Sequence, residues 1–559
     1  LDLANLTLTR DGSVTATAGR LTNGVLTGSA GLTKSGGGTF RIDSTANTFM
    51  GATAIQDGVV EVPSIAAAGV ASSLGSGTGA NATINLGNLG TSGTLRYIGT
   101  TSATTNRTLN LSGTTGGGAI ENDGDGALVM SSAVTVANGS KTLALGGTGT
   151  AANTIGAIGE PGTGDLSVVK DGPGLWRLTG VSTFEGGLTV RNGTVVATVN
   201  SGGGTDAGVF GKADNLTVGN SAVGATGTAT LLLAPGVISD RVLKVPSTTG
   251  GQAVVLGGEA AGTTSEFRNA VWLGRAVTLV AATNGTTTFG NTWAAESGSG
   301  TTEANVTIGA AGSLGTVRLG NNLTTSGSVG VRFGTLNVDD SKTLTAAGIV
   351  GIDSGATLAG VGTVAATLGG AGFVAPGNSP GILTAQSVNP TAGLDFNFEF
   401  TGTAPIYGTG TASINDILRL TGTAASPFTT ALTSANEIAV YLDVASLADG
   451  NTFRGGFFTD LASDFKSRIT DATYTYWVSG TGAGQTTYLT KTYVPLASLY
   501  PSLSMDVTTV SDTATFSGGS PTSGQVMQFT VVVPEPGTLA LAALGLGLAG
   551  WAIRRRRAA

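Results

Sequence analysis

The densest run of acidic residues in the chain is Glu121-Asn122-Asp123-Gly124-Asp125-Gly126. Carboxylate and amide oxygens at this spacing are the kind of ligands that calcium prefers. The run lacks the loop spacing and closing glutamate of an EF-hand, and it also lacks the nonapeptide calcium repeat. We therefore name Asp123 and Asp125 as calcium candidates, although a solvated turn is the favoured interpretation of the run.

Paired carboxylates offer a second chemistry, because two of them about 5 to 10 Å apart hydrolyse a glycosidic bond without histidine. The chain has 34 acidic residues, but no short segment gathers them with Lys or Arg. Clustering across neighbouring coils of the folded chain stays open.

Histidine and cysteine are both absent from the sequence. Their absence excludes Ser-His-Asp triads, Cys-His pairs, His-ligated metals and cysteine-based zinc or iron–sulfur sites. We therefore predict that the chain has no catalytic residues, binds no cofactor and is not an enzyme.

The composition favours a β-rich fold. Glycine supplies 92 of the 559 residues, only 11% of the residues are charged, and 40% are hydrophobic. Segments rich in Thr, Val and Leu that are separated by Gly favour short strands and tight turns. The net charge is −7, and this acidic balance argues against a nucleic-acid partner.

Short alternating segments such as Leu188-Thr189-Val190-Arg191 predict strands with one buried face and one exposed face. Turns such as Asp57-Gly58 and Asn192-Gly193 follow them, because glycine readily adopts the positive φ that these turns need. A parallel β-helix of stacked coils up to about Thr384 is the favoured architecture. A meandering β-sandwich array is the alternative, because Asn-Gly turns also close antiparallel hairpins.

Two segments, Gly31 to Val62 and Asp165 to Val196, follow one template. The positions that they share are Lys34 and Lys170, Gly38 and Gly174, Phe49 and Phe184, Gly51 and Gly186, and Gly58 and Gly193. The template resembles the autotransporter-associated β-strand repeat. One such unit cannot bury its apolar face alone, but stacked units bury a continuous core. The expected fold is therefore all-β, a right-handed parallel β-helix (solenoid).

A third segment supports this fold. The run Pro376-Gly377-Asn378-Ser379-Pro380-Gly381 resembles the PGNSPG element near the end of many autotransporter-type β-helices. In that family a later strand carries an Asp-x-Leu-x-Leu-x-Gly pattern, and Asp416 to Gly422 matches it. We therefore predict a β-helix domain over residues 1–422.

Residues 423–530 are predicted to form a small β-rich cap, because an open β-helix end exposes a strand edge. Their aromatic side chains are expected to fill its core, with a sugar-stacking platform as the alternative. Four apolar residues at helical spacing predict one short helix: Phe457, Leu461, Phe465 and Ile469. The segments Asp471–Val478 and Thr486–Val494 are predicted to pair as strands.

The last predicted domain, residues 531–559, contains an uncharged run from Thr538 to Ile553. Four arginines follow it: Arg554, Arg555, Arg556 and Arg557. As a helix the run would rise about 24 Å, slightly less than the roughly 30 Å hydrocarbon core of a bilayer. The positive-inside rule places the arginines in the cytoplasm and the body outside. We therefore predict one C-terminal hydrophobic helix, a transmembrane helix that anchors transiently in the inner membrane.

The order of Pro534-Glu535-Pro536, the apolar run and the basic cluster closely resembles the PEP-CTERM sorting signal of Gram-negative bacteria. The resemblance implies recognition by an exosortase-type membrane protease and cleavage near Pro534, Glu535 and Pro536. It also implies delivery to the outer surface or extracellular matrix, and a link to biofilm production. No secretory signal is visible at the start of the sequence, at Leu1. Either it has been removed or the sequence is a fragment, and the C-terminal run favours removal.

Together these features predict a non-enzymatic, exported cell-surface or extracellular-matrix protein with a structural or adhesive function. Exopolysaccharide and further copies of the chain, in a homo-oligomer or filament, are the other expected partners. A secreted β-helix polysaccharide lyase or hydrolase is the alternative. Three or more charged residues converging in one groove would favour that alternative.

Overall fold

The computed structural model describes residues 6–9, 19–21, 25–213, 215–296, 301–302, 304–377, 380–402, 415–421, 427–443, 447, 450–459, 465–480, 485–488, 491–501, 503–514 and 522–532. The chain divides into two compact units, Leu1–Ser328 (unit 1) and Val329–Ala559 (unit 2).

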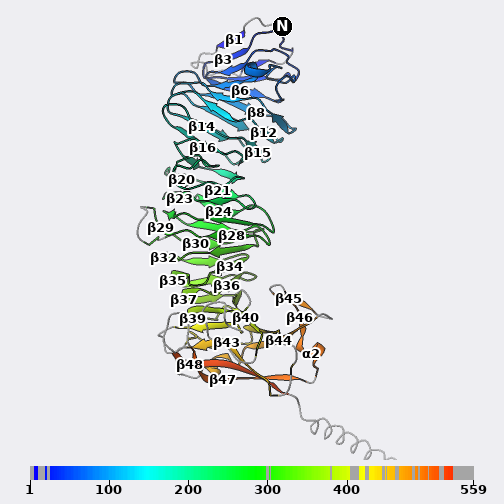
Figure 1. Ribbon diagram of the computed structural model, residues 1–559, viewed down its shortest axis with the longest axis vertical. Coiled ribbons are helices and arrows are strands. Elements are labelled where there is room, and N and C mark those ends of the chain that lie inside the picture. The colour runs from blue at the N-terminus through cyan, green and yellow to red at the C-terminus, as the bar shows by residue number, and fades with distance from the viewer. Residues whose placement is uncertain are drawn as a thin grey trace, which may run out of the picture. The chain divides into compact units, whose positions relative to one another are not determined.

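Unit 1 is a stack of coils built from parallel strands (Figure 1). The chain visits the sheets in turn, so each strand pairs with the strands one coil earlier and one coil later. Sheet 1 contains β1 (Leu6–Thr9), β3 (Leu32–Ser35), β5 (Thr53–Ile55), β7 (Ile84–Leu86), β10 (Leu109–Leu111) and β13 (Val134–Val136). Sheet 2 contains β2 (Gly19–Leu21), β4 (Thr39–Ile42), β6 (Gly58–Val62), β8 (Gly93–Tyr97), β11 (Gly118–Asn122), β14 (Lys141–Gly146), β16 (Leu166–Lys170), β18 (Leu188–Val190), β20 (Asn215–Val218), β23 (Val242–Val245), β26 (Val271–Leu273) and β29 (Trp293–Ala295).

Two further sheets complete the coils of unit 1. Sheet 3 contains β9 (Ala103–Thr105), β12 (Leu128–Met130), β15 (Ala152–Ile155), β17 (Leu175–Leu178), β19 (Gly193–Ala197), β21 (Thr228–Leu233), β24 (Ala253–Gly258), β27 (Val277–Val280), β30 (Val306–Ile308) and β32 (Leu323–Thr325). Sheet 4 contains β22 (Ile238–Ser239), β25 (Thr264–Phe267), β28 (Thr286–Phe289) and β31 (Thr316–Leu319). A short 3₁₀ turn, η1 (Gly79–Ala82), lies between β6 and β7.

The core of unit 1 follows from the alternation of side chains along each strand. On sheet 2, successive coils place apolar residues in register on the inner face, and all of them are buried: Leu143, Val168, Leu188, Leu216, Leu243 and Val271. Burial of each such side chain contributes about 1.5–3 kcal/mol. The parallel pairing confirms the predicted β-helix and rules out a β-sandwich array for these strands.

Unit 2 continues the same kind of parallel pairing in two sheets. Sheet 5 contains β33 (Val329–Val331), β35 (Thr343–Ile352), β37 (Thr363–Gly370), β39 (Ile382–Asn389), β41 (Ile417–Leu420) and β43 (Thr452–Thr459). Sheet 6 contains β34 (Thr335–Val338), β36 (Thr357–Gly360), β38 (Phe373–Pro376), β40 (Asp395–Phe400), β42 (Glu437–Leu442) and β44 (Thr473–Ser479).

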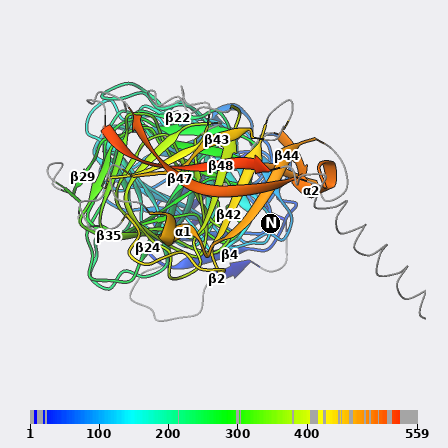
Figure 2. The same ribbon diagram turned by 90° about the horizontal axis from the view of Figure 1, so that it is seen from below.

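Antiparallel strands end both sheets of unit 2. In sheet 5, β43 pairs with β48 (Thr522–Val532), which pairs along its length with β47 (Ser504–Ala514) (Figure 2). In sheet 6, β44 pairs with β46 (Lys491–Pro495), which pairs with β45 (Thr486–Tyr488). The β44–β46 pair confirms the predicted pairing, but the predicted strand Thr486–Val494 contains two antiparallel strands, β45 and β46. Parallel pairing passes residue 422, and the domain boundaries predicted at 422 and 530 stay predictions.

The predicted helix over Phe457 to Ile469 is wrong at its first residue. Phe457 belongs to β43, and only Lys466–Ile469 form a helical turn, α1. Leu461 lies outside the described residues. The Phe457 ring packs edge-on against Phe396 and Phe398, at centroid distances of 4.8 and 5.3 Å. These long-range ring contacts outweigh the local helical spacing, and they fill the core as expected.

A glycine in the second repeat provides a test of the coil geometry. Gly193 has a φ of +74°, and an added Cβ would lie 2.3 Å from the carbonyl oxygen of Gly172. We expect Gly193→Ala to lower the free energy of unfolding by about 2 kcal/mol or more in guanidinium titrations. At Gly251, where nothing lies within 4 Å of an added Cβ, Ala should change it by less than about 0.5 kcal/mol. Equal losses in both variants would contradict this account.

Candidate functional site

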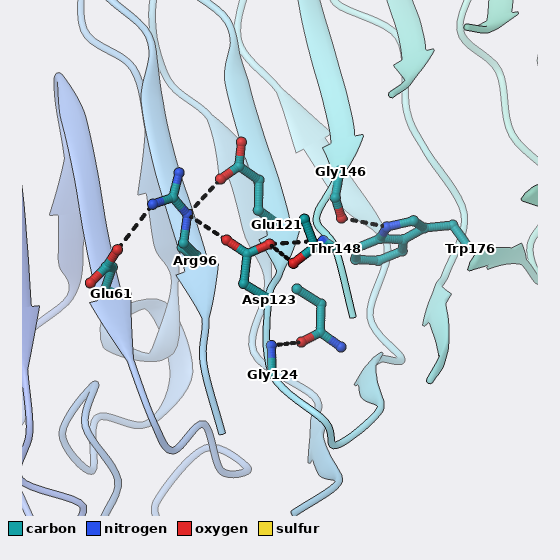
Figure 3. A network of polar contacts seen from close by, with 9 residues as sticks. Glu61, Arg96, Glu121, Asp123, Gly124, Gly146, Thr148 and Trp176 are labelled. Carbon is teal, nitrogen blue, oxygen red and sulfur yellow. Dashed lines mark hydrogen bonds and ion pairs between the residues drawn. The ribbon is translucent and has the colours of Figure 1, made fainter. Parts of the chain in front are cut away.

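The most concentrated group of charges that the structure shows on unit 1 surrounds Arg96 (Figure 3). Glu61 on β6, Arg96 on β8 and Glu121 on β11 occupy one register position of sheet 2, on its outer face. The guanidinium lies 3.0 Å from Glu61 and 2.7 Å from Glu121, and 3.2 Å from Asp123. Four charged side chains from three coils therefore converge, which no short segment of sequence reveals.

The protonation of Arg96 is fixed by these neighbours. Partial burial lowers the pKa of Arg96, but the hydrogen bonds to Glu121 and Glu61 and the charge of Asp123 outweigh it, so the pKa is raised. A guanidinium held in this way cannot act as a base. The group is an ion-pair ladder of partly exposed side chains, in which each pair contributes about 0–1 kcal/mol.

The two calcium candidates have different surroundings. Oδ1 of Asp123 accepts hydrogen bonds from the backbone N–H and the hydroxyl of Thr148, at 2.8 and 3.0 Å (Figure 3). Asn122 is buried, and its side chain accepts from the N–H of Gly124, whereas Asp125 is exposed. Protein donors thus already engage the Asp123 carboxylate. Among the residues that the structure describes, no three acidic side chains are placed to hold a metal ion.

The two template lysines are buried and contact backbone carbonyls. Lys34 is only 2% exposed, although it is charged. Its Nζ donates to three backbone carbonyls, those of Ser35 at 3.1 Å, Gly36 at 2.5 Å and Asp57 at 3.0 Å. The ammonium therefore joins its own turn to the turn one coil later. Carbonyls at such buried turns need a donor, because an unpaired buried polar group is costly.

The second repeat reproduces this arrangement. Nζ of Lys170 donates to the carbonyls of Asp171 at 3.1 Å, Gly172 at 2.5 Å and Asn192 at 3.0 Å. Burial lowers the pKa of Lys170 to about 8, so the side chain remains mostly protonated at neutral pH and keeps all three protons to donate. The same geometry in Lys34 and Lys170 shows that the template positions encode this contact.

The repeated geometry continues beyond the template. Gly75 and Gly211 have φ values of +72° and +76°. An added Cβ at either glycine would lie 2.3 Å from a phenylalanine carbonyl, that of Phe49 or Phe184. Each template phenylalanine is therefore buried beneath a turn one coil later that only glycine fits.

Two buried arginines complete the pattern, and the sequence reasoning missed them. Arg107 donates to the carbonyl of Gly75 at 2.7 Å, and Arg241 donates to that of Gly211 at 2.5 Å. Both arginines are only 2% exposed. Their only sequence signal is an isolated Arg some thirty residues after a glycine, which is too weak to notice without the fold.

In unit 2 the structure joins the two distant elements recognised near the end of the β-helix. Asp416 is fully buried, and its carboxylate accepts from the N–H of Gly381 at 2.8 Å and of Glu399 at 2.7 Å. Burial raises the pKa of Asp416 well above its usual value. Gly377 has a φ of +92°, and a Cβ there would lie 2.5 Å from Asp416 Oδ1. Asp416, at the start of the Asp-x-Leu-x-Leu segment, therefore lies against Gly377 and Gly381 of the PGNSPG element.

A shallow depression of about 650 Å³ lies on unit 1, beside β11, β14 and β16. Its lining is rich in hydroxyl groups and small residues, among them Ser92, Thr115, Ser140, Thr142 and Ser167. Such a surface can donate and accept hydrogen bonds without carrying a strong charge.

The predicted sorting residues Pro534, Glu535, Pro536 and Arg554 to Arg557 lie outside the described residues, as does the predicted hydrophobic helix. Within the part of the chain that is described, no helix has the length and apolarity needed to cross a membrane.

Comparison with known proteins identifies both the sorting motif and the repeats. A model of the PEP-CTERM protein-sorting motif matches residues 532–557, and the Passenger-associated-transport-repeat matches residues 32–62 and 168–197. The chain carries both motifs. The two repeat matches coincide with the two predicted copies of the template.

One curated relative is the Adhesin BmaC autotransporter of Brucella suis biovar 1 (strain 1330), which is 37% identical over 183 residues. The match covers 30% of this chain and 5% of the adhesin, so the chain spans only a small part of that relative's length. No solved structure matches the chain. The sorting motif and the adhesin relative indicate an exported, cell-surface protein.

The buried lysine of the second repeat provides a test of the coil contact. We expect Lys170→Met to lower the free energy of unfolding by about 1.5–3 kcal/mol, because three carbonyls lose a charged donor. The matched control is Lys212→Met, which removes only an exposed ion pair with Glu185 at 3.4 Å and should cost less than about 1 kcal/mol. Urea titrations of both variants compare the two losses, and similar values would refute the assignment.

The tyrosines of unit 2 predict a loss of stability at alkaline pH. Burial raises the pKa of Tyr441 to about 12, with a smaller contribution from the charge of Glu437, and burial also raises the pKa of Tyr474, Tyr476 and Tyr493. Because an unfolded tyrosine ionises near pH 10, the native state holds more protons above that pH, and stability falls as pH rises from about 10 to 12. Ultraviolet titration should therefore show late tyrosine ionisation, coupled to unfolding. Tyr441→Phe should weaken the pH dependence, and an unchanged slope would argue against the assignment.

Proposed function

We propose that this chain is a non-enzymatic structural or adhesive protein of the outer surface or extracellular matrix of a Gram-negative bacterium. The observation that carries the proposal is the presence, in one chain, of passenger-type β-helix repeats and a PEP-CTERM sorting motif. The repeats supply a surface of stacked coils, and the sorting motif supplies the signal for delivery to the cell surface.

The positions of the buried cationic side chains support a structural role. Lys34, Lys170, Arg107 and Arg241 are each buried and donate to backbone carbonyls, so they serve the fold. The exposed hydroxyl-rich depression of unit 1 suits weak, repeated hydrogen bonding to a polysaccharide or to a neighbouring copy. Exopolysaccharide, a homo-oligomer or filament, and a contribution to biofilm are therefore part of the proposal.

A secreted polysaccharide lyase or hydrolase is the second candidate, and the convergence of Glu61, Arg96, Glu121 and Asp123 favours it. Such an enzyme would need a free base and a carboxylate facing the substrate. Here Arg96 is paired with all three carboxylates. The test is turnover of neutral or uronate glycans by the purified protein. Turnover that is lost in Arg96→Gln would establish the enzyme and contradict the non-enzymatic proposal.

Sorting provides the direct test of the first proposal. In a host with an exosortase-type protease, we expect the chain to reach the cell surface with an intact mass that places its new end near Pro534-Glu535-Pro536. Alanine at all three positions should retain an uncut chain in the inner membrane, because the protease loses its recognition element. Glu185→Ala, at an exposed site of unit 1, is the matched control. Equal surface recovery and equal mass for the triple variant would sink the proposal.

A further inference from the structure

One polar cluster of unit 2 joins three strands of sheet 6. Nζ of Lys491, at the start of β46, lies 2.7 Å from Oε1 of Glu399 on β40 and 2.7 Å from Oδ2 of Asp443 just after β42. The hydroxyl of Tyr493 donates to the same Glu399 oxygen at 2.8 Å. The Glu399 side chain is fully buried, whereas those of Lys491 and Asp443 are 35% and 30% exposed.

The backbone fixes this arrangement. Strands β40 and β42 pair in parallel, with Phe400 opposite Leu442. The N–H of the next residue, Asp443, donates to the carbonyl of Phe400 at 2.8 Å. Asp443 is thereby held beside Glu399. Lys491 and Tyr493 lie two positions apart on β46, so both side chains point to the same face.

Two further aromatic rings extend from Tyr493. The rings of Tyr441 and Tyr493 meet edge-on at a centroid distance of 5.2 Å, and Trp477 stacks on Tyr441 at 6.2 Å. Tyr493 therefore joins the buried Glu399 carboxylate to this group of rings, whereas Lys491 and Asp443 are partly exposed.

We propose that Lys491 and Asp443 form an intramolecular amide (isopeptide) bond, with Glu399 as the proton acceptor for the lysine. A bond forms between Nζ of Lys491 and Cγ of Asp443, and one Cγ–O bond of Asp443 breaks. Glu399 takes a proton from the ammonium and passes it to the leaving oxygen. Two protons of the ammonium and one oxygen of the carboxylate leave as water, so no oxidant, reductant or outside reactant is needed.

The charge state of the lysine explains why a third group is required. Burial lowers the pKa of Lys491, but hydrogen bonds to Asp443 and Glu399 and their charges outweigh it and raise the pKa. Lys491 therefore starts as an ammonium, which is not a nucleophile. Glu399 touches Nζ from a fully buried position, and Tyr493 orients the same oxygen.

The bond would serve the protein as a disulfide serves other exported proteins, because this chain contains no cysteine. It would close a loop from Asp443 to Lys491 that includes β43, α1 and β44. A covalent link of this kind stabilises a fold by restricting its unfolded chain.

Peptide mapping of the full-length purified protein by mass spectrometry tests the bond. We expect a chain that is lighter by one water molecule, no tryptic cleavage after Lys491, and a branched fragment that joins the Asp443 and Lys491 peptides. Asp-Gly sequences such as Asp123-Gly124 also lose water by forming succinimides, which hydroxylamine cleaves. The branched, hydroxylamine-resistant fragment is therefore the decisive signal.

Two variants and one control separate the roles. Lys491→Arg keeps the positive charge and should lose the branched fragment, and Glu399→Gln should also lose it. Lys212 and Glu185, an ion pair at 3.4 Å, should remain unlinked. A wild-type map with cleavage after Lys491 would show an ion pair only and would overturn the proposal. If the Glu399→Gln protein still contains the branched fragment, the proposed role of Glu399 is wrong. The wild-type peptide map shows whether the bond exists even if that variant does not fold.

Discussion

Stacking of the coils in unit 1 depends on donors for the backbone carbonyls that converge at its turns. A parallel ladder satisfies the strands, but the turns leave carbonyls buried between coils. Lys34, Lys170 and Lys141 each donate to three such carbonyls, and Arg107 and Arg241 serve two further turns. Long cations are suited to this role, because one side chain carries several donors across a coil.

Unit 2 has the opposite requirement, an acceptor for buried backbone N–H groups, and the carboxyl group of Asp416 supplies it. Its carboxyl oxygens accept from the backbone N–H of Gly381, which precedes β39, and from that of Glu399 on β40. Buried polar side chains in this protein therefore satisfy backbone carbonyls in unit 1 and backbone N–H groups in unit 2. The outer face of unit 1 presents hydroxyls, small residues and the ion-paired group in which Arg96 contacts three carboxylates.

The recognised repeat is shorter than the structural unit to which it belongs. The matched segments end near Val62 and at residue 197, yet the turn glycines Gly75 and Gly211 and the arginines that contact them repeat the same contacts further on. A coil buries its face only against the next coil, so the positions that define one unit extend into its neighbour.

The sequence by itself determined the β-helix, the two repeat copies with the equivalent positions Lys34 and Lys170, and the sorting motif. Each of these is written in local periodicity or in contiguous motifs. Only the tertiary structure decided which residues meet: Arg96 with its three carboxylates, Arg107 with Gly75, and Lys491 with Glu399 and Asp443. It also placed Phe457 in a strand, against its helical spacing. The physical reason is that register between coils depends on coil lengths and long-range packing, which a local pattern does not encode.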